Sequence, residues 1–97
     1  MFVDYTADWC VTCKVNEAQV LESDTIREVF KRKKVHKFVA DWTKRDEVIR
    51  ASLARYNRAA VPMYLVYGPG YKGALRLPEL LTEKIVLDAL QKVSNAP

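Results

Sequence analysis

The chain has 97 residues, of which 49% are hydrophobic and 29% are charged, with three glycines and four prolines. This length and composition are typical of one compact globular domain and exclude a disordered or fibrous chain, so we expect residues 1–97 to form a single domain. No stretch approaches the roughly 20 apolar residues of a membrane-spanning helix, and no charged leader precedes an apolar signal core. Because the chain opens directly inside the apolar run Met1-Phe2-Val3, we expect a domain cut from a longer protein.

The formal net charge is +4, and much of the basic excess lies in Lys31-Arg32-Lys33-Lys34, followed by His36 and Lys37. Such a run can be a nucleic-acid patch or a solvated helix end, where cations oppose the negative end of the helix dipole. No aromatic residues are interleaved with the run to stack on bases. We therefore favour the helix end and expect no nucleic-acid partner.

Strands and helices alternate in the first half of the chain. Residues 1–7 are aromatic, β-branched and apolar, and they predict a buried strand interrupted by the charge of Asp4. A helical pattern begins at about Val11 and is broken and capped again at Ser23-Asp24-Thr25. Residues 35–42 predict a second strand.

The next predicted helix has Thr43 as its N-cap, and its apolar residues Val48, Ile49, Leu53 and Tyr56 are expected on one inward face. Asn57 is expected to end this helix in the left-handed conformation.

Two further strands and a helix complete the chain. Residues 61–67 predict a third strand, Gly68-Pro69-Gly70 a turn, and residues 73–77 a short fourth strand paired antiparallel with the third. Thr82 is the expected N-cap of a final helix. The inward face of that helix is expected to carry Ile85, Val86, Ala89, Leu90 and Val93.

The predicted order is β-α-β-α-β-β-α. It gives an α/β fold in which a mixed four-stranded sheet is flanked by helices. We expect the strands that are joined through helices to run parallel, and the final hairpin to be antiparallel.

Cys10 and Cys13 are the only cysteines, and they lie at the junction between the first strand and the helix after it. Residues three apart on a helix are about 5 to 6 Å apart on one face, so a reversible disulfide can form with little backbone movement. Cys10, at the exposed helix start, would have its thiolate stabilised by unpaired backbone N–H groups and the helix dipole. Cys13, one turn further on, is expected to be more buried.

The same two cysteines allow other functions. Tetrahedral zinc needs four ligands, and His36 is the only histidine. A static disulfide that closes so short a loop would constrain the unfolded chain only weakly. Copper carriers also place Cys-x-x-Cys after a strand, although their element order is β-α-β-β-α-β, and a redox-silent binding module remains a further alternative. We favour disulfide exchange with protein substrates through a mixed disulfide, without a cofactor beyond the thiols.

Three other residues near the dithiol have both a functional and a structural interpretation. Asp4 is either exposed on a strand edge or buried, and we favour burial, since a buried carboxylate has a raised pKa and can relay a proton during exchange. Glu17, one turn beyond Cys13, either shares that role or is an ordinary surface residue. Trp9 either shapes the surface around Cys10 or only packs.

Pro62 opens a run of strand-forming residues, where its missing N–H is tolerated only at a strand's first residue, at an edge or at a bulge. A trans proline at the start of a strand would also satisfy this rule.

The motifs around the dithiol form a specific combination: Ala7-Asp8-Trp9-Cys10-Val11-Thr12-Cys13-Lys14, preceded by Asp4 and followed by Val61-Pro62. This combination is similar to that of the thioredoxin superfamily, and the similarity covers nearly the whole chain. The resemblance is strongest to the C-terminal domain of DsbD-type membrane thiol:disulfide interchange proteins of bacteria. Further matching features are Glu17, Ala40-Asp41-Trp42-Thr43 and Val61-Pro62-Met63-Tyr64. Where thioredoxin itself has Gly-Pro between its cysteines, this chain has Val11-Thr12.

The resemblance implies a role for each residue of the site. It implies that Cys10 is the attacking thiol and Cys13 the resolving thiol, and that Asp4 and Glu17 are the acids that tune Cys13. It further implies that the bond between Val61 and Pro62 is cis, that this segment faces the dithiol, and that it contacts the substrate together with Trp9.

The resemblance also implies a cellular setting. In that family, which is associated with cytochrome c biogenesis, the domain is a periplasmic part of an inner-membrane protein. It receives electrons from a membrane-embedded cysteine pair and passes them to a periplasmic partner domain. We accordingly expect a monomeric domain that has these two protein partners.

Overall fold

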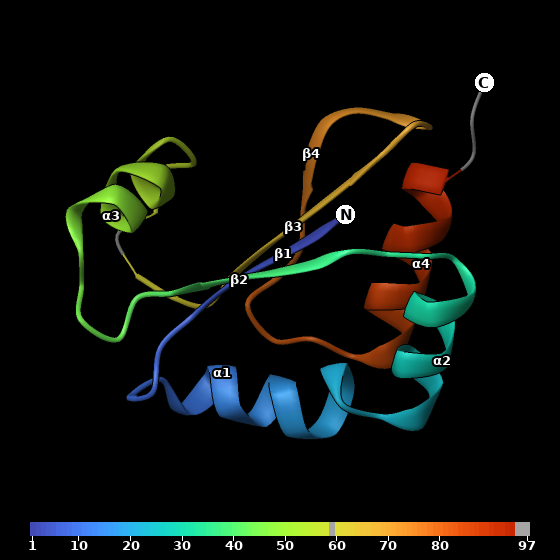
Figure 1. Cartoon of the computed structure of the whole chain (residues 1–97), viewed down its shortest axis with the longest axis horizontal. Coiled ribbons are helices and arrows are strands. Elements are labelled where there is room, and N and C mark those ends of the chain that lie inside the picture. Colours follow the sequence, from blue (N-terminus) through green and yellow to red (C-terminus); the bar gives the residue numbers. More distant parts are fainter. Residues whose placement is uncertain (59, 95–97) are drawn as a thin grey trace.

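The structure, a computed structural model, describes residues 1–58 and 60–94. Its elements follow the predicted order (Figure 1). They are β1 (Phe2–Thr6), α1 (Val11–Asn16), the π-helical segment η1 (Glu17–Leu21), α2 (Asp24–Arg32), β2 (Lys37–Asp41), α3 (Glu47–Ala54), β3 (Met63–Gly68), β4 (Tyr71–Arg76) and α4 (Glu83–Ser94).

The four strands form one mixed sheet in the order β2-β1-β3-β4. The parallel pairing of β1 with β2 and the antiparallel hairpin of β3 and β4 are confirmed. The expectation that β3 runs parallel to the earlier strands is wrong, because β3 pairs antiparallel with β1. The connection from β2 through α3 to β3 leaves the sheet and returns to it at the end where β1 finishes, since Asp41 lies opposite Thr6 and Met63 lies opposite Tyr5. A strand that starts at that end has to run back along β1.

Helices cover both faces of the sheet, with α3 on one side and α2 and α4 on the other (Figure 1). Successive strand residues point to opposite faces. One core contains Phe2, Tyr64 and Val66 together with apolar residues of η1, α2 and α4. The other contains Tyr5, Met63 and Leu65 together with Leu53 of α3 and both cysteines. The dithiol therefore lies at the edge of the second core.

Three of the predicted helix boundaries are confirmed. The Ser23 hydroxyl accepts a hydrogen bond from the Ile26 N–H at 3.3 Å and caps α2. The Thr82 hydroxyl accepts one from the Ile85 N–H at 3.1 Å at the start of α4. Asn57 follows α3 with a φ of 59°, in the left-handed region. Among the described residues, no helix combines the length and the apolar character that crossing a bilayer requires.

The prediction for the start of α3 is wrong. Asp46, not Thr43, is the N-cap, because its carboxylate accepts a hydrogen bond from the Ile49 N–H at 3.0 Å. Val48 was expected to face inward but is 81% exposed, while Leu53 is fully buried. Moving the cap by three residues shortens the helix at its start, and its core-facing stripe begins at Ile49, which packs against the second core.

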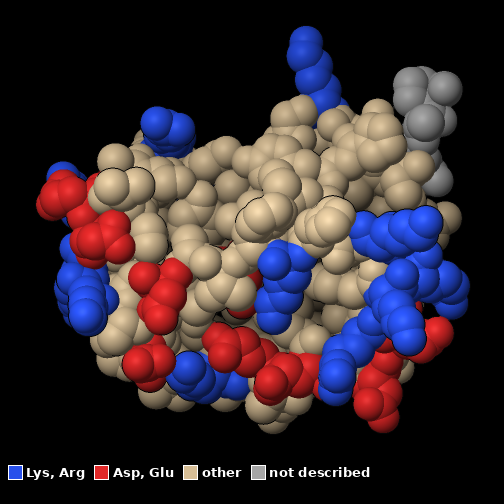
Figure 2. All heavy atoms as spheres, in the orientation of Figure 1, with Lys and Arg blue, Asp and Glu red and all other residues tan. Residues whose placement is uncertain are grey.

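The basic run Lys31-Arg32-Lys33-Lys34 is exposed at the end of α2, as predicted. Figure 2 shows Lys and Arg side chains gathered over this side of the molecule, with acidic side chains next to them. Cations at the carboxyl end of a helix oppose the negative end of its dipole. The position of the run agrees with the interpretation as a solvated helix end.

Candidate active site

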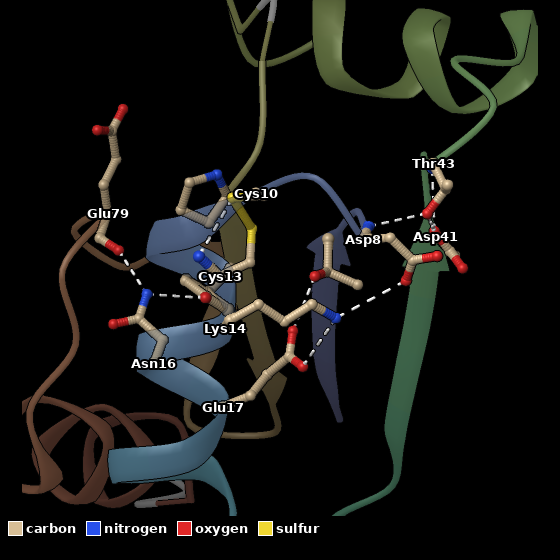
Figure 3. Close-up of a disulfide and its surroundings, with 12 residues drawn as sticks. Asp8, Cys10, Cys13, Lys14, Asn16, Glu17, Asp41, Thr43 and Glu79 are labelled. Atoms are coloured by element: carbon tan, nitrogen blue, oxygen red, sulfur yellow. Dashed lines mark hydrogen bonds and ion pairs between the residues drawn. A yellow bond between two sulfur atoms is a disulfide. The ribbon is translucent and has the colours of Figure 1, made fainter.

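Cys10 and Cys13 are joined by a disulfide at the start of α1, and their Cα atoms are 5.2 Å apart (Figure 3). Cys10 is the N-cap residue, with an extended backbone, and Cys13 lies in the first turn of the helix. Cys10 is 7% exposed and Cys13 is fully buried, so the predicted order of exposure is confirmed. The Cys10 side chain is nevertheless less exposed than its place at the helix start suggested, because Cys10 packs into the second core.

The start of α1 is suited to stabilise a thiolate on Cys10. The backbone N–H of Cys13 donates a hydrogen bond to the Cys10 Sγ at 3.1 Å. A thiolate at this position also meets the positive end of the helix dipole and other unpaired N–H groups of the first turn. The geometry therefore favours Cys10 over Cys13 as the ionised thiol when the pair is reduced.

Asp4 is buried inside the sheet, with 1% of its surface exposed, so the prediction of burial is confirmed. Burial raises the pKa of Asp4 to about 6, and the charges of Lys37 and Lys14 oppose this shift while that of Glu17 adds to it. Its Oδ1 atom has no hydrogen-bond partner within the described part of the chain. Asp4 is therefore a proton-binding group poised between its two charge states near neutral pH.

Glu17, at the start of η1, is partly buried beside β1. The Thr6 hydroxyl donates a hydrogen bond to its Oε2 at 2.8 Å, and the Lys14 Nζ lies 3.8 Å from its Oε1 (Figure 3). Lys14 also lies 3.7 Å from the Asp8 carboxylate. Among the residues that the structure describes, neither Glu17 nor Asp4 is hydrogen-bonded to a cysteine sulfur. A role for either acid at the dithiol would therefore require a bridging water or a longer-range electrostatic effect.

Trp9 precedes the dithiol and is 43% exposed. Its Nε1 donates a hydrogen bond to the Thr43 carbonyl at 3.1 Å, and the guanidinium of Arg45 lies 4.5 Å from the centre of its ring. The Thr43 hydroxyl accepts a hydrogen bond from the Asp8 N–H at 2.9 Å, so Thr43 holds the turn before Cys10 instead of capping α3. With Val11 and Val15, Trp9 lines a shallow groove beside α1.

The Val61–Pro62 peptide bond is cis, as the resemblance implied. Val61 is 8% exposed and belongs to the same core as both cysteines, and Pro62 is also buried. The segment precedes β3, and Met63, the first residue of that strand, pairs with Tyr5 at the end of β1 from which the dithiol loop departs. The structure thus brings this segment to the end of the sheet where the dithiol lies.

Sequence reasoning missed a polar group behind the dithiol. Asn16 on α1 is 1% exposed and donates hydrogen bonds to the Glu79 carbonyl at 2.7 Å and to the Tyr64 hydroxyl at 2.9 Å. Burial raises the pKa of the Tyr64 hydroxyl far above its usual range. The Arg58 guanidinium is paired with Glu79. An asparagine inside an otherwise amphipathic helix was the one available signal for this group.

No group of three or more His, Cys, Asp or Glu side chains in residues 1–58 and 60–94 is arranged to hold a metal ion.

Comparisons with known proteins identify the family and the fold of the chain. A family model described as thioredoxin-like matches residues 1–69. The chain is 36% identical over 70 residues to the thiol:disulfide interchange protein DsbD 1 of Pseudomonas aeruginosa; the match covers 72% of this chain but only 12% of that protein. The fold matches the C-terminal domain of Neisseria meningitidis DsbD in its oxidised and reduced forms, with TM-scores of 0.78 and 0.76 and 19% identity in both cases. These matches cover 96% of this chain and 78% and 79% of the two structures. With its Cys-x-x-Cys dithiol, the chain belongs to the thioredoxin-like family.

Proposed function

We propose that this domain is a thiol:disulfide oxidoreductase that exchanges disulfides with partner proteins through Cys10 and Cys13. The observation that carries the proposal is the geometry of the pair. One sulfur, at the helix start, accepts a backbone N–H, and the other is fully buried one turn further on. A pair of this kind can open and close while the helix stays in place. We propose that the reaction uses no cofactor besides the two thiols.

In the proposed reaction the reduced domain meets a substrate disulfide. The Cys10 thiolate attacks one substrate sulfur, which forms a mixed disulfide and releases the other substrate sulfur as a thiolate. Cys13 then loses its proton and attacks the Cys10 Sγ, which closes the Cys10–Cys13 disulfide and releases the second substrate thiolate. The substrate gains two electrons and the domain loses two. Of the two protons that the substrate thiolates take up, one comes from Cys13 and the other from solvent, because Cys10 attacks as a thiolate.

The proposed proton acceptor for Cys13 is the Asp4 carboxylate, with Glu17 as the group that adjusts it. The raised pKa of Asp4, about 6, lets it take up and release a proton near neutral pH. Glu17 adds negative charge that favours the protonated form of Asp4. The proton would pass between Asp4 and Cys13 through water.

The proposed docking site for the substrate is formed by Val61–Pro62 and Trp9. The 61–62 segment leads into β3 at the end of the sheet where the dithiol lies, and an extended substrate chain could pair with its backbone. Trp9 is partly exposed next to Cys10 and offers an apolar surface to the same chain.

The proposed setting follows from similarity to the DsbD 1 protein of Pseudomonas aeruginosa, of which the chain spans about an eighth. In this setting the domain is monomeric and belongs to a longer bacterial inner-membrane protein that faces the periplasm. It takes electrons from a membrane-embedded cysteine pair and gives them to a periplasmic acceptor domain.

The experiment that tests the function uses insulin as a protein disulfide. The reduced wild-type domain should reduce insulin and become oxidised, with one domain disulfide formed for each insulin disulfide lost. Cys13→Ser should accumulate a covalent mixed disulfide with insulin, because no second thiol is present to resolve it, whereas Cys10→Ser should form none. Thr12→Ser, between the two cysteines, is the matched control and should behave as the wild type. A wild-type domain that reduces neither insulin nor a small disulfide such as dithiobis(nitrobenzoate) would contradict the proposal and favour a redox-silent binding module.

A further inference from the structure

A chain of polar contacts joins the dithiol helix to the segment that carries Pro62. Asn16, one turn after Cys13, donates a hydrogen bond to the Glu79 carbonyl at 2.7 Å (Figure 3). The Glu79 carboxylate is paired with the Arg58 guanidinium. The Nη2 of Arg58 in turn donates a hydrogen bond to the Pro62 carbonyl at 3.1 Å. The loop between β4 and α4 therefore connects the two sides of the site.

Asn16 fixes this loop to α1. Besides its bond to Glu79, the Asn16 Oδ1 accepts a hydrogen bond from the Leu81 N–H at 3.0 Å, and its amide donates to the Tyr64 hydroxyl at 2.9 Å. The side chain is buried, so these bonds are shielded from water. The loop position that carries Glu79 is therefore set relative to the dithiol helix.

The surroundings of Arg58 suit a role in holding the Pro62 carbonyl better than a role in stabilising the fold. Its side chain is 20% exposed, whereas that of its partner Glu79 is 59% exposed. Its buried Nε has no partner within the described residues. A partly buried guanidinium with an unsatisfied N–H loses part of what its ion pair gains, so the pair is a weak source of stability. What it does provide is a fixed donor for the Pro62 carbonyl.

We propose that Arg58 is a positioning residue for exchange with protein disulfides. Held by Glu79, it fixes the backbone that follows Val61 and so sets the direction in which this segment meets an extended substrate chain. This inference rests on the proposed function, in which the 61–62 segment docks the substrate. Arg58 does not touch the sulfur atoms, so its effect is confined to substrates large enough to reach the docking segment.

The test compares a large and a small disulfide with the same set of reduced variants. Insulin is the protein substrate, and dithiobis(nitrobenzoate) is a small one that reaches only the dithiol. Arg58→Met should lower kcat/KM for insulin about tenfold, mainly through KM, as expected for the loss of one charge-assisted hydrogen bond at the docking segment. The rate with the small disulfide should stay within about twofold of the wild type, since the dithiol itself is unchanged.

Glu79→Gln is the second variant. The substitution is at an exposed position, keeps the backbone carbonyl that Asn16 binds and removes only the charge that holds Arg58. It therefore tests the inference even if Arg58→Met does not fold. It should lower kcat/KM for insulin about threefold, and the double variant should be no slower than Arg58→Met alone, because Glu79 acts through Arg58. The control is Arg50→Met, which breaks the exposed Glu47–Arg50 pair on α3 and should change neither rate.

Two results would overturn the inference while leaving the proposed function intact. One is an equal loss with both disulfides in Arg58→Met and Glu79→Gln, and the other is insulin reduction in these variants at the rate of Arg50→Met. A wild-type domain that reduces dithiobis(nitrobenzoate) but not insulin would remove the docking model and this inference together. A wild-type domain that reduces neither would remove the proposed function itself.

Discussion

Replacing Asp4 by asparagine should change the stability of the domain in a strongly pH-dependent way. Asp4 has its pKa raised from 3.8 to about 6, with burial as the main cause. The folded domain therefore keeps a proton on Asp4 at pH values where the unfolded chain has lost it. Below the pKa that Asp4 has in the unfolded chain, its contribution to stability is fully present. This contribution is lost as the pH rises from 3.8 through about 6, the pKa of Asp4 in the folded domain. The ionised carboxylate then costs the folded domain about 3 kcal/mol, at about 1.4 kcal/mol for each unit of pKa.

Asp4→Asn removes this cost because an amide does not ionise. The free energy of unfolding of the variant minus that of the wild type should rise by about 3 kcal/mol between about pH 3.5 and about pH 8. The assay is urea unfolding of the oxidised proteins, followed by tryptophan fluorescence, over that pH range. Asp24→Asn, at an exposed position, is the control for the replacement of one carboxylate by an amide. Parallel stability curves for Asp4→Asn and the wild type would refute the raised pKa.

Three further predictions concern residues around the dithiol. Asn16→Ala should lower the free energy of unfolding by about 3 kcal/mol in urea unfolding, because it leaves two buried groups and one partly buried carbonyl without their partner, and an unchanged midpoint would contradict this. Glu17→Gln should shift the pH profile of insulin reduction to lower pH, because it removes a negative charge that favours the protonated form of Asp4; a profile identical to the wild type would exclude Glu17 from the reaction. Trp9→Ala should slow insulin reduction more than that of dithiobis(nitrobenzoate), and equal effects in the two assays would remove Trp9 from the docking surface.

Local patterns in the sequence were enough to predict much of the fold and the position of the reactive cysteine pair. Strand and helix periodicity predicted the element order, and the hydroxyls of Ser23 and Thr82 mark real helix starts. The spacing of Cys10 and Cys13 predicted a disulfide and the difference in their burial, because both follow from positions within one helical turn. Burial of Asp4 followed from its place in an apolar strand.

The features that could not be predicted depend on contacts between distant parts of the chain. Thr43 and Asp46 are both good N-cap residues. In the structure the Thr43 hydroxyl accepts a hydrogen bond from the distant Asp8 N–H, and Asp46 caps the helix instead. The direction of β3 depends on where the chain re-enters the sheet. The link from Asn16 to Glu79 spans 63 positions and leaves no periodic signal.

The central claim, that Cys10 is the nucleophile of a redox-active dithiol, is tested most directly by alkylation of the reduced wild-type domain. The domain is treated briefly with iodoacetamide at about pH 6, where an ordinary thiol of pKa about 8.5 hardly reacts, and the modified residue is identified by mass spectrometry. We predict modification of Cys10, with Cys13 unmodified, because Cys10 lies at the helix start and its sulfur accepts the Cys13 N–H. Faster modification of Cys13, or no reaction at either cysteine, would contradict the account.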